Sequence, residues 1–157
     1  MQLTMPKDIK SIVIASHNEG KVREIRSLLD PYGYKIISAK KLGINEPIEN
    51  GMTFSENSLI KSRNAAKKSG LVALADDSGL CVNSLNYRPG IYSARWAGKN
   101  KDFGMAMKKI QKLMEKNDLL SKYNRRAFFV CSLSVYFPDG KNKVFNGRVN
   151  GHLKFPP

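Results

Sequence analysis

An apolar, β-branched run at Ile12–Ala15 ends abruptly in the polar segment Ser16–Lys21, and this junction constrains the fold more than any other feature. A buried strand followed by a polar loop and a helix start is where α/β proteins build ligand sites. Backbone N–H groups at the helix start favour an anion there, and Lys21 adds a positive charge. An ordinary strand-to-helix turn with one solvated lysine is the alternative interpretation. The segment is not a Walker A loop, because Val22 stands where that motif requires Ser or Thr.

A second polar segment, Ala75–Leu80, follows another apolar run, Leu71–Leu74. The pattern predicts that the adjacent carboxylates Asp76 and Asp77 lie at a strand end. Magnesium is held by oxygen ligands, usually one or two carboxylates together with substrate phosphates. A plain Asp-Ser-Gly turn is the alternative, since such residues form turns readily. A phosphate loop and an acidic corner in one small domain together indicate phosphoanhydride chemistry.

Hydrophobic periodicity predicts an alternating order of strands and helices. Strands are expected at Ser11–Ser16, Tyr34–Ser38, Leu71–Asp76, Leu80–Val82, Arg126–Phe137 and Lys143–Leu153, and helices at Lys21–Leu29, Thr53–Ser69 and Phe103–Met114. Thr53 and Glu56 form the capping-box pattern at the start of the second helix. The segment Asn83–Asn100 is expected to be irregular, and Pro138–Gly140 to form a hairpin turn.

Four short blocks occur in a fixed order along the chain. They are Ser16-x-Asn18-x-Gly20-Lys21, Thr53-Phe54-x-Glu56-Asn57, Ala75–Leu80 and Pro89–Arg95. Their order and approximate spacing resemble those of the inosine triphosphate pyrophosphatase family, also called Ham1-like or dITP/XTP pyrophosphatases. The resemblance extends from about Ser11 to the last residue. Maf-type pyrophosphatases share a similar first loop, but Asp76–Gly79 and Tyr92–Arg95 favour the Ham1-like branch.

The resemblance implies an α/β fold with a mixed central β-sheet flanked by helices, the ITPase-like (Maf/Ham1) arrangement, with residues 1–157 in a single domain. It implies Mg²⁺-dependent hydrolysis of non-canonical purine nucleoside triphosphates (ITP, dITP and XTP) to the monophosphate and pyrophosphate. A homodimer is also expected. The alternative is a catalytically weak or inactive homologue that acts as a basic nucleotide- or nucleic-acid-binding protein.

Roles for individual residues also follow from the resemblance. Asp77 is the implied catalytic base, Glu49 and Asp77 are the implied Mg²⁺ ligands, and Asp76 is a supporting acid. The implied substrate contacts are Ser16, His17, Asn18, Glu19, Gly20, Lys21, Lys61 and Ser78. From the residues alone, Glu49 is an exposed loop acid with Glu46 as a competitor, and Lys61 is a solvated helix lysine. Tyr92 and Arg95 form either a wall of the cleft or plain packing, and His17 occupies a variable loop position.

The chain is strongly basic, with 27 Lys and Arg against 13 Asp and Glu and a formal net charge of +14. Such an excess implies a polyanionic partner, either nucleotides or nucleic acid. The basic residues are scattered and form no dense tail, which favours a surface that attracts a triphosphate over specific nucleic-acid binding.

Composition gives further expectations. No apolar stretch is long enough to cross a bilayer, and Met1–Lys10 has no apolar signal core, so a cytoplasmic location is expected. Cys81 and Cys131 lie in apolar, strand-like runs without metal-ligand spacing. Both are predicted to be buried as small hydrophobic residues.

Members of the resembled family continue beyond Gly151–Pro157 with motifs that stack on and read the purine base. These 157 residues contain none of them, so we expect a C-terminally truncated domain, poor discrimination between ITP and ATP, and low activity. We also expect exposed apolar faces at Phe128, Phe129 and Val144, which would favour self-association.

Overall fold

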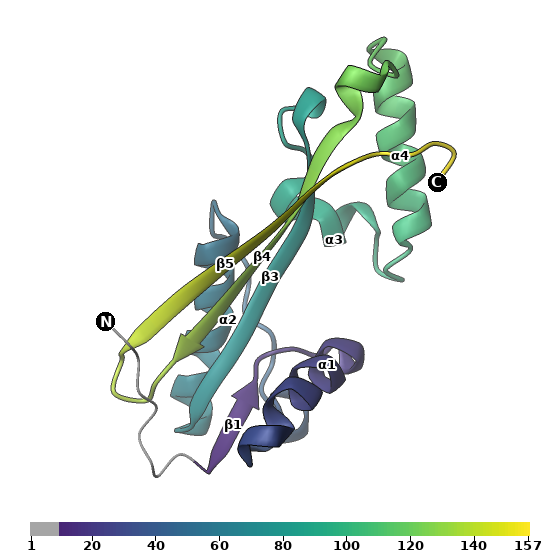
Figure 1. Ribbon diagram of the computed structural model, residues 1–157. Coiled ribbons are helices and arrows are strands. Elements are labelled where there is room, and N and C mark those ends of the chain that lie inside the picture. Colours follow the sequence, from purple (N-terminus) through teal and green to yellow (C-terminus); the bar gives the residue numbers. More distant parts are fainter. Residues whose placement is uncertain (1–9) are drawn as a thin grey trace. The chain divides into compact units, whose positions relative to one another are not determined.

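A five-stranded β-sheet in the order β2-β1-β3-β4-β5 is the framework of the chain (Figure 1). The computed structural model describes residues 10–157, and the prediction made for Met1–Lys10 falls, apart from Lys10, outside the described residues. The strands are β1 (Ser11–Ile14), β2 (Lys35–Ser38), β3 (Val72–Val82), β4 (Arg126–Tyr136) and β5 (Asn142–His152). Strand β1 pairs in parallel with both β2 and β3, whereas a tight turn joins β4 to β5. The mixed sheet confirms the predicted fold class.

The helices are α1 (Glu19–Leu29), α2 (Phe54–Ser69), α3 (Ser93–Trp96) and α4 (Phe103–Lys116). Short 3₁₀ turns occupy Asp30–Tyr32, Lys40–Leu42, Asn83–Leu85, Gly90–Tyr92 and Lys122–Arg125. The chain divides into two compact units. One contains the described residues up to Asp76 together with Leu133–Phe145, and the other contains Asp77–Ser132 and Asn146–Pro157.

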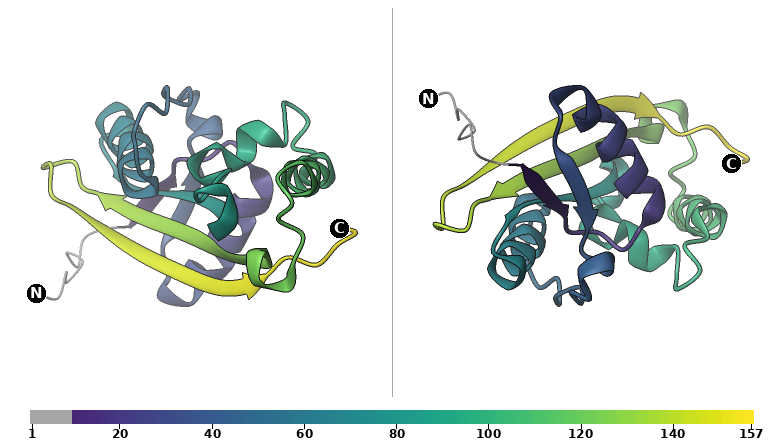
Figure 2. Two further views of the ribbon diagram at one scale, coloured as in Figure 1. Left: turned by 90° about the horizontal axis from the view of Figure 1, so that it is seen from above. Right: turned by 90° about the horizontal axis from the view of Figure 1, so that it is seen from below.

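In the first unit, α1 and α2 cover opposite faces of β1 and β2 (Figure 2). Successive strand side chains point to opposite faces, so β1 contributes to two apolar clusters. Ile12 and Ile14 pack with Val22 of α1, whereas Val13 packs with Ala65 of α2. The apolar run Ile12–Ala15 is therefore buried on both sides, as a central parallel strand requires.

Local capping chemistry sets the start of α2. The Thr53 hydroxyl accepts a hydrogen bond from the Glu56 backbone N–H at 3.1 Å, and the Glu56 carboxylate accepts one from the Met52 N–H at 2.6 Å. This confirms the predicted cap, although Glu56 reaches back one residue further than a standard capping box. Gly70 ends the helix in the left-handed conformation, with φ of 68°.

The core of the second unit forms around α4. Ile110 and Met114 are fully buried on this helix and pack against Val82, Leu85 and Ala127. Asp102 caps the helix by accepting a hydrogen bond from the Met105 N–H at 2.9 Å. The predicted helix is confirmed and ends at Lys116.

The acidic corner differs from the prediction. Two short strands with a turn between them were expected, but β3 is one continuous strand from Val72 to Val82. Asp76 and Asp77 therefore lie within the strand, not at its end, and are only 9% and 8% exposed. The turn preference of Asp-Ser-Gly is weak and local, and strand pairing and burial outweigh it. The segment predicted to be irregular also contains one helical turn, α3.

The prediction for the two cysteines is half right. Cys81 is buried, but Cys131 is exposed on β4. Residues of a strand alternate between faces, and an apolar run does not reveal which face is covered. The exposed apolar residues are likewise only partly as expected, since Phe129 is 49% exposed whereas Phe128 and Val144 are partly buried.

The difference in burial between Cys81 and Cys131 gives a direct test of the packing. Cys131 should react rapidly with a thiol reagent in the folded protein, whereas Cys81 should react only after unfolding. Burial raises the pKa of the Cys81 thiol, an effect that the nearby Arg148 charge offsets only in part, so its reactive thiolate is scarce. Mass spectrometry of peptides after timed alkylation measures both rates. Equal labelling of the two cysteines would contradict the packing described for β3 and β4.

None of the helices among residues 10–157 has the length and apolar character that a membrane span requires.

Candidate functional site

The loop after β1 is held together by its own polar side chains. The Ser16 hydroxyl accepts a hydrogen bond from the Asn18 N–H at 3.1 Å. The Asn18 side-chain oxygen caps α1, accepting from the N–H groups of Gly20 at 3.0 Å and Lys21 at 3.4 Å. Asn18 thus occupies the backbone N–H groups of Gly20 and Lys21 at the start of α1, which would otherwise be available to an anion. Glu19 lies in the first turn, exposed, with its carboxylate 3.9 Å from the Lys40 ammonium.

Lys21 is not a solvated surface lysine. Its ammonium group forms an ion pair and hydrogen bond with the Asp76 carboxylate on β3. The lysine side chain is 37% exposed and the aspartate side chain 11% exposed. The ion pair therefore joins Lys21, a predicted phosphate contact, to Asp76, the predicted supporting acid.

A second lysine and carboxylate form the same kind of pair. The Lys61 ammonium on α2 lies 3.1 Å from the Glu49 carboxylate, and the two side chains are 12% and 34% exposed. Lys61 is therefore largely removed from water, unlike the solvated helix lysine that the residues alone would suggest. Glu49 belongs to the segment between Leu42 and α2, so this ion pair also ties that segment to the helix.

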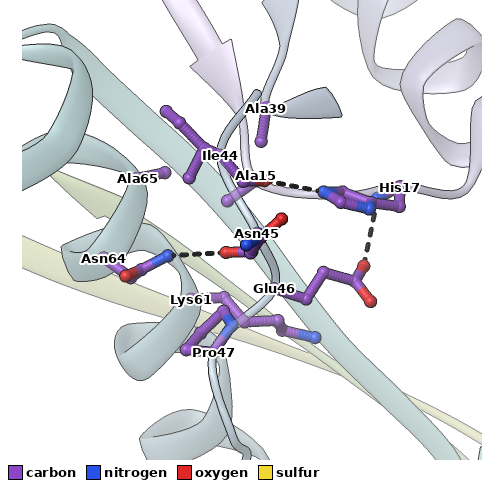
Figure 3. Close-up of a pocket in the computed structure, with 10 residues that line it drawn as sticks. All are labelled: Ala15, His17, Ala39, Ile44, Asn45, Glu46, Pro47, Lys61, Asn64 and Ala65. Atoms are coloured by element: carbon purple, nitrogen blue, oxygen red, sulfur yellow. Dashed lines mark hydrogen bonds between the residues drawn. The ribbon is translucent and has the colours of Figure 1, made fainter. Parts of the chain in front are cut away.

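His17 and Glu46 support the loop from one side of a small pocket in the first unit (Figure 3). The His17 Nε2 lies 2.8 Å from the Ile44 carbonyl oxygen, and the His17 backbone N–H donates to the Glu46 carboxylate at 3.1 Å. The lining residues are Ala15, His17, Ala39, Ile44, Asn45, Glu46, Pro47, Lys61, Asn64 and Ala65. Glu46, the competing acid in the sequence, is thus engaged in holding the loop backbone, and Lys61 lines the same pocket as His17.

Gly51 and Asn57 fix the segment that carries Glu49, and sequence reasoning gave neither a role of its own. The buried Asn57 side chain accepts a hydrogen bond from the Gly51 N–H at 2.9 Å. A Cβ at Gly51 would lie 2.7 Å from both the Asn57 side-chain oxygen and the Glu56 Cβ. The available signal was the position of this glycine two residues before the Thr53–Asn57 block.

Gly51→Ala should therefore destabilise the protein and displace the Glu49 segment. Forcing a methyl group into a packed site typically costs about 1–3 kcal/mol of unfolding free energy. Chemical denaturation measures the loss. Gly147→Ala is the matched control, because a Cβ there meets only the Cys131 carbonyl oxygen, at 3.9 Å. An equal effect of the two substitutions would refute the close-packing argument.

The second unit begins with Asp77. Its carboxylate Oδ1 accepts a hydrogen bond from the Ser78 N–H at 3.1 Å. Further along, the Ser93 hydroxyl accepts from the Leu80 N–H at 3.0 Å and donates to the Gly90 carbonyl at 2.6 Å. Ser93 thus ties the Pro89–Arg95 block to β3, a role that the sequence did not reveal.

Tyr92 and Arg95 contact one another. The Arg95 guanidinium lies 4.9 Å from the centre of the Tyr92 ring, in a cation–π arrangement. Both groups belong to the second unit, and this contact gives Tyr92 a packing role.

The donor chemistry fits a hard divalent cation. Among residues 10–157, no three or more His, Cys, Asp or Glu side chains gather into a metal cluster. Mg²⁺ does not require such a cluster, because one or two carboxylates plus substrate phosphates satisfy it. Asp77, Asp76 and Glu49 are all oxygen donors of the right type, whereas a zinc site would call for His or Cys ligands.

Comparison with known proteins places this arrangement in a family. A dITP/XTP pyrophosphatase from Zymomonas mobilis is 54% identical over 147 residues, which cover 93% of this chain and 69% of the relative. A dITP/XTP pyrophosphatase from Rhodopseudomonas palustris is 49% identical over 146 residues, 93% of this chain and 70% of the relative.

Solved structures agree. A HAM1 protein from Coxiella burnetii superimposes with a TM-score of 0.85 at 35% identity, covering 95% of this chain and 75% of that one. The Staphylococcus aureus Ham1 protein gives a TM-score of 0.77 at 42% identity, covering 92% and 72%. The model of the Ham1 family matches residues 12–157. With the sequence blocks, the fold and these relatives in agreement, the chain belongs to the Ham1 family.

Proposed function

We propose that this chain is a nucleoside triphosphate pyrophosphatase that converts non-canonical purine nucleotides, namely ITP, dITP and XTP, to the monophosphate and pyrophosphate. The observation that carries the proposal is its 54% identity over 147 residues to a dITP/XTP pyrophosphatase. The two lysine–carboxylate pairs support it, because hydrolysis of a triphosphate needs cations for the phosphates and carboxylates for a metal and a proton.

Glu49 and Asp77 are the residues that would hold Mg²⁺, and their carboxylate oxygens suit it. When bound, Mg²⁺ supplies charge neutralisation for pyrophosphate, which is otherwise a poor leaving group. The protein's own cations act in the same direction. Lys21 and Lys61 bind the β- and γ-phosphates and withdraw charge from the leaving group as it departs.

Asp77 is the proposed general base. Its carboxylate orients a water molecule toward the α-phosphorus and accepts one of that water's protons. The water oxygen forms a bond to the α-phosphorus while the bond to the α,β-bridging oxygen breaks, so the nucleoside monophosphate keeps the new oxygen. Ser78 and the Ser16–Lys21 loop are the proposed substrate contacts that hold the triphosphate in line for this attack.

Isotope labelling tests the reaction type. Hydrolysis of ITP in H₂¹⁸O should place one ¹⁸O atom in IMP and none in pyrophosphate, as read by mass spectrometry. Label in inorganic phosphate, with IDP as the other product, would show attack at the γ-phosphorus and overturn the assignment. Tight nucleotide binding without turnover would instead favour the basic binding protein that the sequence left as an alternative.

We further propose that two copies of the chain associate. Phe129 and Val149 of the second unit are 49% and 72% exposed and line the same surface depression, and contiguous exposed apolar surface marks an interface. Light scattering after size exclusion should give twice the chain mass of 17.6 kDa. Phe129→Ser should shift the protein toward the monomer, and a wild-type protein that is monomeric throughout would contradict the proposal.

A further inference from the structure

We propose that Lys61 serves as an internal counter-ion for Glu49, a ligand of the proposed metal site, and that Lys21 does the same for the supporting acid Asp76. Each lysine pairs with its acid, and Lys61 moves to a substrate phosphate when a divalent cation takes Glu49. The inference rests on the proposed function for the identity of the triphosphate, but the exchange itself is read by cation binding alone.

The Lys61–Glu49 pair carries the argument. The two charged atoms are 3.1 Å apart, and the lysine side chain is only 12% exposed. An ammonium group this far removed from water is costly without an anion beside it. A cation that takes Glu49 must therefore compete with Lys61 for this carboxylate.

Lys61 lies in a suitable place for such a transfer. It lines the same pocket as His17, which belongs to the loop proposed to hold the phosphates (Figure 3). A phosphate oxygen of the substrate held by that loop is an anion that can replace Glu49. The Glu49 carboxylate keeps its charge compensation in the exchange, because a divalent cation replaces the monovalent ammonium group of Lys61.

Lys21 repeats the arrangement with different elements. It comes from the first turn of α1, whereas its partner Asp76 lies on β3 with a side chain that is 11% exposed. Both proposed phosphate lysines are thus paired with acids of the proposed site, through separate helices. The Lys61–Glu49 pair makes binding of the cation and of the triphosphate mutually dependent, since the cation takes Glu49 and the triphosphate takes Lys61.

The proposed exchange predicts effects of a Lys61 substitution that differ from those of a residue that only stabilises the fold. Removing the Lys61 charge should strengthen binding of a divalent cation in the absence of nucleotide, because the cation no longer competes with the ammonium group. The same substitution should weaken binding of inorganic tripolyphosphate in the presence of the cation. A residue that only stabilises the fold would weaken both.

The experiment uses Mn²⁺ as the probe, measured by electron paramagnetic resonance on the full chain. Lys61→Met should bind Mn²⁺ alone about three- to tenfold more tightly than wild type, as expected for loss of a competing charge in a half-buried pair. With Mn²⁺ saturating, tripolyphosphate should bind Lys61→Met roughly tenfold more weakly in calorimetry. The matched control is Lys67→Met, an exposed lysine on the same helix, which should change neither constant by more than about twofold.

A double-mutant cycle identifies the partner. In a Glu49→Gln background, Lys61→Met should no longer tighten Mn²⁺ binding, because the carboxylate for which the two cations compete is gone. Unchanged or weaker Mn²⁺ binding in Lys61→Met, or no detectable Mn²⁺ binding in either protein, would overturn the proposal. If Lys61→Met tightens Mn²⁺ binding while wild type fails to hydrolyse ITP, the exchange stands and the proposed activity fails.

Discussion

Asp77→Asn should lower kcat for ITP hydrolysis by about 10²–10⁴-fold, the range typical for removal of a general base. The amide cannot accept the proton of the attacking water and is a poor ligand for Mg²⁺. Folding should be intact, because the substitution is nearly isosteric and the amide oxygen can still accept the hydrogen bond from the Ser78 N–H. Steady-state assays of pyrophosphate release, with circular dichroism as the folding check, measure the effect.

Asp118→Asn is the matched control for this experiment. Asp118 is exposed and has a left-handed backbone, with φ of 54°, which asparagine accommodates well. It removes the same charge from the chain and should leave kcat within about twofold, since exposed charges are screened. Unchanged turnover in Asp77→Asn would remove Asp77 from the catalytic role.

Lys21→Ala is expected to weaken binding of a triphosphate far more than binding of the corresponding monophosphate. A charge-assisted hydrogen bond contributes roughly 1.5–3 kcal/mol, or about 10- to 150-fold in affinity. The lysine is proposed to contact the β- and γ-phosphates, which the monophosphate lacks. Calorimetry with a non-hydrolysable ITP analogue and with IMP, both with Mg²⁺, measures the difference.

The structure adds a second effect of this substitution. Asp76 loses the ion pair with Lys21, so the melting temperature should fall as well. Lys40→Ala is the control, because Lys40 is exposed and its carboxylate partner lies at 3.9 Å. Equal losses of affinity for the triphosphate and the monophosphate would show that Lys21 does not contact the phosphate tail.

The parts of the fold that depend on residues close together in the chain could be predicted from the sequence. The periodicity of Lys21–Leu29, the Thr53 cap and the Gly70 stop are local signals, and the structure confirms each of these helix boundaries to within two residues. The continuity of β3 from Val72 to Val82 could not be predicted from such local signals. Its continuity through Asp76 and Asp77 depends on pairing with strands distant in the chain, which outweighs the local turn preference.

The candidate site, like the fold, was predicted from the sequence only where the signals are local. The sequence blocks identify the Ham1 family and contain Lys21 and Asp76, and the family resemblance adds Glu49 and Lys61 as residues of interest. The partners of these residues do not follow from spacing, since Lys21 and Asp76 are 55 positions apart and are joined only by the packing of α1 beside β3. The roles of Gly51 and Ser93 depend on close approach and on backbone hydrogen bonds, which their positions beside and within the sequence blocks do not reveal.

Pyrophosphate release from ITP tests the central claim most directly. The full chain is mixed with ITP and Mg²⁺, alongside the same chain with the metal chelated and alongside Asp77→Asn. The account predicts pyrophosphate and IMP in equal amounts from the wild-type chain with Mg²⁺, and at most about one hundredth of that rate in the other two samples. Equal rates in all three samples, or IDP and inorganic phosphate as the products, would contradict it.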